Sequence, residues 1–121
     1  MHHAAQAYAK TAQATVSPRE LEAGLLVKAA SRLQSVRDSG GHSARQLYDA
    51  LYYNRKLWTV LVSSATRAEN PLPNPIKQNI ANLGLFIFDR TLDVQMSPDP
   101  KKLDILITIN RELAAGLNAN N

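Results

Sequence analysis

The stretch Asn70-Pro71-Leu72-Pro73-Asn74-Pro75 decides the fold, because it separates two long segments in which apolar residues recur with helical spacing. Its three prolines lack backbone N–H donors and bias the residues before them toward extended geometry. We therefore expect a rigid corner over residues 70–74 with Leu72 turned inward, and a new helix that begins at Asn74-Pro75.

The two segments beside the corner both predict long helices. The first begins near Ser43, a candidate N-cap, and its predicted buried stripe consists of Leu47, Leu51, Trp58, Leu61 and Ala65, widened by Tyr48, Tyr52 and Val62. The stripe of the second consists of Ile76, Ile80, Leu83, Ile87 and Val94. Because Leu85, Phe86 and Phe88 make the second helix apolar around most of its circumference, we expect it to be the central one. Gly84 costs about 1 kcal/mol relative to alanine in a helix, which suggests that another backbone passes close by.

Start and stop signals place further helices on either side. Residues 4–14 are rich in alanine and predict a helix of weak amphipathicity, and Ser17-Pro18-Arg19-Glu20 is a capping box that starts a second helix. That helix should end before Ser39-Gly40-Gly41. Asp99-Pro100 opens a last helix with Asn110 on its apolar stripe.

The last helix has one local ambiguity, because Ile105, Ile107 and Ile109 also alternate as in a strand; the helical pattern on both sides favours a helix. Residues 118–121 should form a loose tail. The fold prediction is an all-α protein: a single domain over residues 1–121, built as a compact bundle of about five helices with the proline-rich corner between the third and fourth.

Composition limits the function classes. A chain of 121 residues that is 45% apolar and 20% charged suits one globular domain. It has no cysteine, its first residues lack the order of a signal peptide, and no run approaches the roughly 20 apolar residues that span a bilayer. We therefore expect a cytoplasmic protein that does not insert into membranes.

The sequence offers no arrangement of residues for catalysis. His2, His3 and His42 lie at a terminus and in a glycine-flanked loop, where rigid placement beside a nucleophile is not expected. Gly40-Gly41 lacks the lysine and the preceding strand of a phosphate-binding loop. We predict no enzyme, no cofactor and no metal site.

The net charge of +4 comes from the front half of the chain, since residues 70–121 carry equal numbers of basic and acidic side chains. Within residues 1–40 the basic residues are Lys10, Arg19, Lys28, Arg32 and Arg37, against the acidic Glu20, Glu22 and Asp38. The basic residues are spaced singly and have no aromatic platform beside them, which favours a solvated helix face over an RNA-binding stripe.

Two polar or aromatic side chains leave alternatives open. Trp58 is either a core residue, which is the more frequent case, or an anchor for a partner. A buried Asn110 without partners would cost about 1–3 kcal/mol. It either fixes helix register or bonds a partner's backbone, or it is satisfied by the proline-rich corner, which we favour.

The order and spacing of several short motifs resemble the FlaF family of flagellar biosynthesis regulators over nearly the whole chain. The motifs are Ala7-Tyr8, Ser17-Pro18-Arg19-Glu20-Leu21-Glu22-Ala23, Leu57-Trp58-Thr59, Asn70 with Leu72-Pro73, Leu83-Gly84-Leu85, and Leu106-Ile107-Thr108-Ile109-Asn110.

The resemblance implies a small helical protein of the bacterial cytoplasm that binds flagellin, whose terminal segments are apolar and helix-prone, and presents it for secretion. It also implies action alongside the FlbT regulator of flagellin messenger RNA. Because helices with spare apolar surface can receive a partner's helix, the partner-binding residues that we predict are Tyr52, Leu57, Trp58, Leu61, Leu72, Phe86, Phe88, Ile105 and Ile109. The alternative function is RNA-associated regulation of flagellin synthesis through the basic front half, and it predicts binding that weakens steeply with salt.

Overall fold

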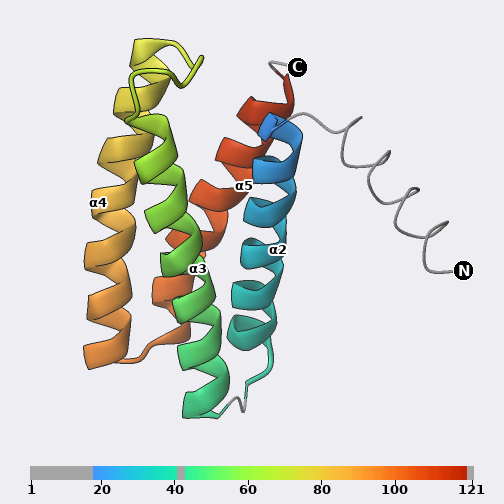
Figure 1. Cartoon of the computed structure of the whole chain (residues 1–121). Helices are drawn as coiled ribbons and strands as arrows, with labels where there is room; N and C mark the ends of the chain where they lie inside the picture. The colour runs from blue at the N-terminus through green and yellow to red at the C-terminus, as the bar shows by residue number, and fades with distance from the viewer. Residues whose placement is uncertain (1–17, 41–42, 120–121) are drawn as a thin grey trace, which may run out of the picture.

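The computed structural model describes residues 18–40 and 43–119, which form four α-helices and one short 3₁₀ helix (Figure 1). The α-helices are α2 (Pro18–Asp38), α3 (Ala44–Ala65), α4 (Asn74–Met96) and α5 (Leu103–Ala119), and the 3₁₀ helix is η1 (Pro100–Lys102). No strand occurs in these residues, so the all-α class is confirmed, and Ile105 to Ile109 are helical. The count of about five helices is slightly off, with four described; the helix expected over residues 4–14 lies outside the described ranges.

The arrangement of the helices differs from the expectation in one respect. The helix α4 is not central: it packs mainly on α3, touches α5 only slightly and lies at one edge of the bundle (Figure 1). The helix α3 lies between α4 and the pair formed by α2 and α5. The wide apolar circumference of α4 misled the prediction, because Leu85 and Phe86 are exposed rather than buried.

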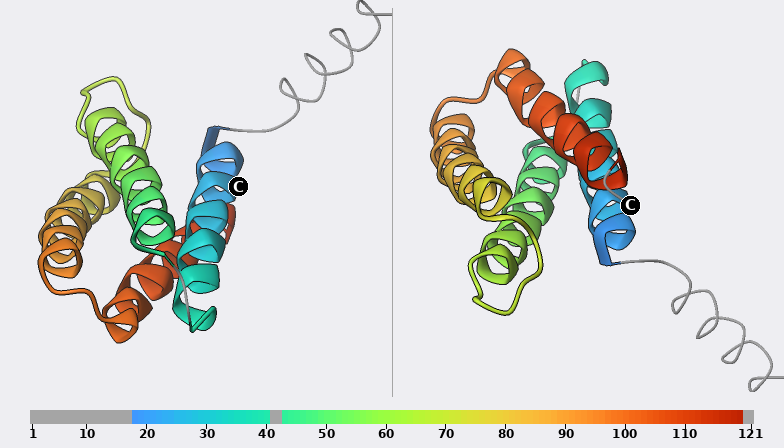
Figure 2. Two further views of the ribbon diagram at one scale, coloured as in Figure 1. Left: turned by 90° about the horizontal axis from the view of Figure 1, so that it is seen from below. Right: turned by 90° about the horizontal axis from the view of Figure 1, so that it is seen from above.

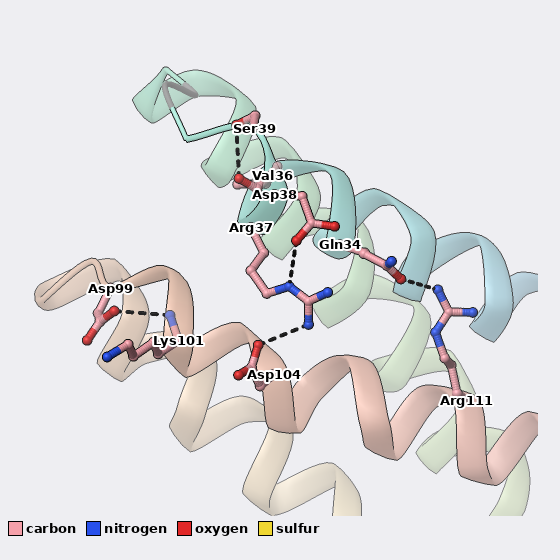
Figure 3. Close-up of polar contacts among 9 residues, drawn as sticks. All are labelled: Gln34, Val36, Arg37, Asp38, Ser39, Asp99, Lys101, Asp104 and Arg111. Carbon is pink, nitrogen blue, oxygen red and sulfur yellow. Dashed lines mark hydrogen bonds and ion pairs between the residues drawn. The ribbon is translucent and has the colours of Figure 1, made fainter.

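The antiparallel pair α2 and α5 makes the most extensive helix contact in the described chain. Three small residues on α2, Ala23, Ala29 and Ala30, are buried in the core. Polar contacts fix the outer side of the pair (Figure 3). Arg37 Nη1 donates to Asp104 Oδ1 at 3.0 Å, and Arg111 Nη2 donates to Gln34 Oε1 at 2.6 Å.

Local signals set the helix ends as expected. Ser43 accepts from the backbone N–H of Gln46 at 3.1 Å, and the Gln46 side chain accepts from Ser43 N at 2.9 Å, which completes a capping box. Gly40 has a φ of 65°, a conformation that favours glycine, just after α2 ends. At its other end the chain stays helical through Asn118 and Ala119, two residues of the expected tail.

The proline-rich corner turns Leu72 into the core, as the sequence predicts. Asn70 holds the corner: its Oδ1 accepts from Leu72 N at 2.9 Å, and its Nδ2 donates to Ser64 O at the end of α3 at 3.1 Å. The helix α4 then begins at Asn74, with Pro75 in its first turn.

Candidate partner-binding surface

A buried hydrogen-bond chain fixes the position of Trp58. Trp58 Nε1 donates to Asn110 Oδ1 at 2.9 Å, and Asn110 Nδ2 donates to Asn54 Oδ1 at 2.7 Å. All three side chains are fully buried. The expectation that Asn110 bonds the proline-rich corner is therefore wrong, because its partners lie on α3, and the amide sets the register between α3 and α5.

Four of the predicted partner-binding residues lie in the core. These are Leu57, Trp58, Leu61 and Leu72, each less than a tenth exposed. Their helical spacing is the spacing of a core stripe, and in the closed fold their side chains already pack against the protein itself. A partner can reach them only at the edges of surface hollows, as at Leu72.

Helices α4 and α5 diverge from their short connection (Figure 2). An apolar groove lies between them. The groove, which we call the α4–α5 groove, has a volume of about 350 Å³. Its lining residues are Arg19, Leu72, Ile76, Asn79, Leu83, Ile109, Glu112, Leu113, Gly116 and Leu117. Apolar side chains from both helices thus form its walls, and three polar side chains lie among them.

Of the predicted residues outside the core, one lines the groove and two lie on the same helices beyond its lining residues. Ile109 lines the groove directly. Ile105 lies one turn earlier on the same side of α5, and Phe86 lies three residues after Leu83 on α4. Both are partly exposed, at 37% each, and they continue the two walls toward the α4–α5 connection.

The two remaining predicted residues, Tyr52 and Phe88, lie between α3 and α4. They line a hollow of about 420 Å³ together with Arg55, Lys56, Thr59 and Leu92. A neighbouring hollow of about 610 Å³ includes Tyr48, whose ring stacks on that of Tyr52 with centroids 6.1 Å apart. The predicted residues therefore do not form one site.

The sequence reasoning missed Tyr48, Leu92 and Leu113 as surface residues of these hollows. A usable signal existed for two of them, because Tyr48 stands four residues before Tyr52 and Leu113 four after Ile109, on the same helix faces. Gly116 was missed as well. A Cβ atom there would meet nothing within 4 Å, so the groove is open beside it.

The basic residues at the front of the chain do not form a continuous stripe. Asp38 and Asp104 engage Arg37 and raise the pKa of its guanidinium. Arg32 and Lys28 lie over the ring of Tyr53, at 4.3 and 5.8 Å from its centroid. Arg19 lines the α4–α5 groove, and Lys10 lies outside the described residues.

Titratable groups form no metal-binding cluster within residues 18–40 and 43–119. Burial raises the pKa of Glu22, and Arg19 partly offsets this shift. No helix in the described ranges combines the length and the apolar character that a membrane span needs.

Comparison with known protein families shows which family this chain belongs to. The family described as flagellar protein FlaF matches residues 4–117. The chain belongs to the FlaF family. The resemblance read from the motifs is thereby confirmed. The FlaF match includes the Trp58 hydrogen-bond chain, both walls of the α4–α5 groove and the hollows between α3 and α4. Comparisons with curated proteins and with solved structures gave no match.

Proposed function

We propose that this FlaF protein is a cytoplasmic chaperone that binds flagellin and supports its secretion. In this proposal, an apolar helix of flagellin docks in the α4–α5 groove. The observation that carries the proposal is the pair of facing apolar walls. Ile76 and Leu83 on α4 and Ile109 and Leu113 on α5 line one groove instead of closing on each other. The family membership supplies the flagellar context.

The chemistry of the groove suits an amphipathic helix. Helix recognition in a groove depends on apolar anchors spaced by three or four residues, and the walls offer apolar side chains at comparable spacing. Arg19, Asn79 and Glu112 provide polar groups beside the apolar walls. An apolar centre with polar groups around it is the usual anatomy of a protein interface.

The proposed role requires no catalysis, cofactor or metal. Action alongside the FlbT regulator is part of the same proposal and rests on the family alone. The docked helix would cover apolar surface on flagellin before export. Each Å² of apolar surface so removed from water contributes about 25 cal/mol, before the ordering costs of binding are subtracted.

A substitution at Gly116 tests the groove without disturbing the core. A side chain at this position enters open space in the groove, so Gly116→Phe should fill the site that the flagellin helix needs. We expect flagellin affinity to fall about tenfold or more, which corresponds to about 1.4 kcal/mol or more. Thermal stability should not fall, since replacing a helical glycine is favourable by several tenths of a kcal/mol or more.

The matched control is Gly24→Phe on α2, where a Cβ atom also meets nothing within 4 Å and which does not line the groove. Isothermal titration calorimetry with purified flagellin measures both variants, and circular dichroism confirms their helicity. Wild-type protein that fails to bind flagellin at micromolar concentrations contradicts the chaperone role. Equal affinity of wild type and Gly116→Phe contradicts the location of the site.

A further inference from the structure

A group of exposed apolar side chains outside the α4–α5 groove lies on the outer side of α3 and α4. We call it the outer face and define it by Tyr48 and Tyr52 on α3 and by Leu85, Leu92 and Met96 on α4. Leu85, Leu92 and Met96 are 66%, 57% and 84% exposed and recur at intervals of seven and four residues, so they form one stripe along α4. A stripe of this kind on a soluble protein commonly marks an interaction site.

The charges on the outer face are divided between its two helices. On the α3 side, Arg55 and Lys56 line the same hollow as Tyr52, and Asp49 is paired with Arg45 at 3.4 Å, so this side is positive on balance. On the α4 side, Asp89 lies between Leu85 and Leu92 and is negative. Neither Lys56 nor Asp89 forms an ion pair within the described residues. Lys56 and Leu92 line the same hollow, so the two charges stand at similar heights along the antiparallel helices.

This division fits a second copy of the same chain. A two-fold axis parallel to α3 and α4 places α3 of one copy over α4 of the other and leaves every residue at its own height. Lys56 then faces Asp89 of the second copy, and Tyr48 and Tyr52 face its Leu92 and Met96. Two-fold interfaces pair one surface patch with itself, and they are the commonest among soluble homo-oligomers.

We propose that the outer face is the interface of a two-fold homodimer of this chain. The interface leaves the α4–α5 groove uncovered, because Phe86, Leu83 and Ile76 stand on a different side of α4 from Leu85, Leu92 and Met96. The dimer therefore presents two open grooves, and it does not depend on flagellin binding. No groove residue takes part in the contact.

Sedimentation equilibrium of the full chain tests the dimer. Wild-type protein at about 100 µM should have close to twice the mass of the single chain, 13.3 kDa, because a dimer with a dissociation constant of about 1 µM or tighter is nearly complete at this concentration. Leu92→Glu and Met96→Glu should each weaken the dimer about tenfold or more, because they bring a carboxylate into the apolar contact. Val27→Glu, at a partly exposed apolar position on α2, is the matched control and should leave the mass unchanged.

Charge reversal tests the register. Lys56→Glu alone and Asp89→Lys alone should each favour the monomer, whereas the double variant Lys56→Glu/Asp89→Lys should restore the dimer, because the pairing between copies is re-formed with opposite signs. Circular dichroism shows whether each variant is folded. A monomeric wild type, a dimer that survives both Leu92→Glu and Met96→Glu, or dissociation by Val27→Glu would overturn the proposal. Failure of the double variant to restore the dimer would overturn the register.

Discussion

At Asn110, one side-chain amide determines how two helices far apart in the sequence meet. Its oxygen accepts from the indole N–H of Trp58, and its nitrogen donates to the oxygen of Asn54. The Nδ2 group of Asn54 has no partner among the described residues. The two buried asparagines are therefore unequal, because Asn110 satisfies two neighbours and Asn54 satisfies one.

This inequality predicts different costs for the same substitution. Asn110→Leu leaves the Trp58 N–H and the Asn54 oxygen unpaired, and we expect it to lower the free energy of unfolding by about 2–4 kcal/mol. Asn54→Leu leaves only the Asn110 Nδ2 unpaired and also removes the unpartnered donor, so its cost should be below about 1 kcal/mol. Urea unfolding of both variants measures the difference. Equal costs would show that the hydrogen bonds do not decide the stability of this site.

The helices α3 and α4 pack closely where Gly84 faces α3. A Cβ atom at Gly84 would collide with Cγ2 of Val62, and Trp58 lies next to the same point. The sequence suggested a neighbouring backbone at Gly84; the close neighbour is instead a branched side chain. Such a side chain has few ways to move aside, since χ1 of valine is restricted in helices.

Gly84→Ala should therefore destabilise the protein, although alanine is favoured over glycine in a helix by about 1 kcal/mol. The additional variant Val62→Ala removes the colliding methyl group, so the double variant Gly84→Ala/Val62→Ala should be more stable than Gly84→Ala alone. Gly24→Ala, with nothing within 4 Å of the new Cβ, is the control and should stabilise the protein. Thermal unfolding of the wild type, Gly84→Ala, Gly84→Ala/Val62→Ala and Gly24→Ala measures these differences in stability. A stabilising Gly84→Ala would contradict the close approach.

On the scale of the whole molecule, the described helices are joined unequally. Helices α2 and α5 share an extensive contact and two side-chain hydrogen bonds, Arg37 to Asp104 and Arg111 to Gln34. Helix α4, in contrast, is attached mainly through α3. A peripheral helix with few neighbours opens at a lower free energy than the rest of a domain. The groove proposed to bind flagellin has one wall on α4 and the other on α5 of the α2–α5 pair. Because α4 is the less firmly attached helix, its wall can adjust to a partner.

Hydrogen exchange tests this inequality. Under native conditions, backbone amides in the middle of α4 should exchange through openings at least about 1 kcal/mol lower in free energy than those of α2 and α5. Mass spectrometry of peptides from the three helices measures the exchange rates. Added flagellin should slow exchange in α4 and α5 and leave the middle of α2 unchanged. Exchange in α4 as slow as in α2 would contradict the proposed loose attachment.

The sequence by itself determined the all-α class and the proline-rich corner between α3 and α4. The spacing of Leu47, Leu51 and Trp58 predicts a buried stripe, and the signals at Ser43 and Asn70 are local, so each acts within a few residues of the chain. The family resemblance was equally readable, because it depends on the order of short motifs.

Only the tertiary structure decided which apolar residues are hidden. Leu57 and Phe86 both fit an apolar helix face, but the edge position of α4 exposes Phe86, while the contacts of α3 bury Leu57. Likewise, the partners of Asn110 lie more than fifty residues away in the sequence. Periodicity specifies the side of a helix on which a residue lies, whereas burial depends on the neighbour that packs there, and that neighbour is set by the arrangement of the whole bundle.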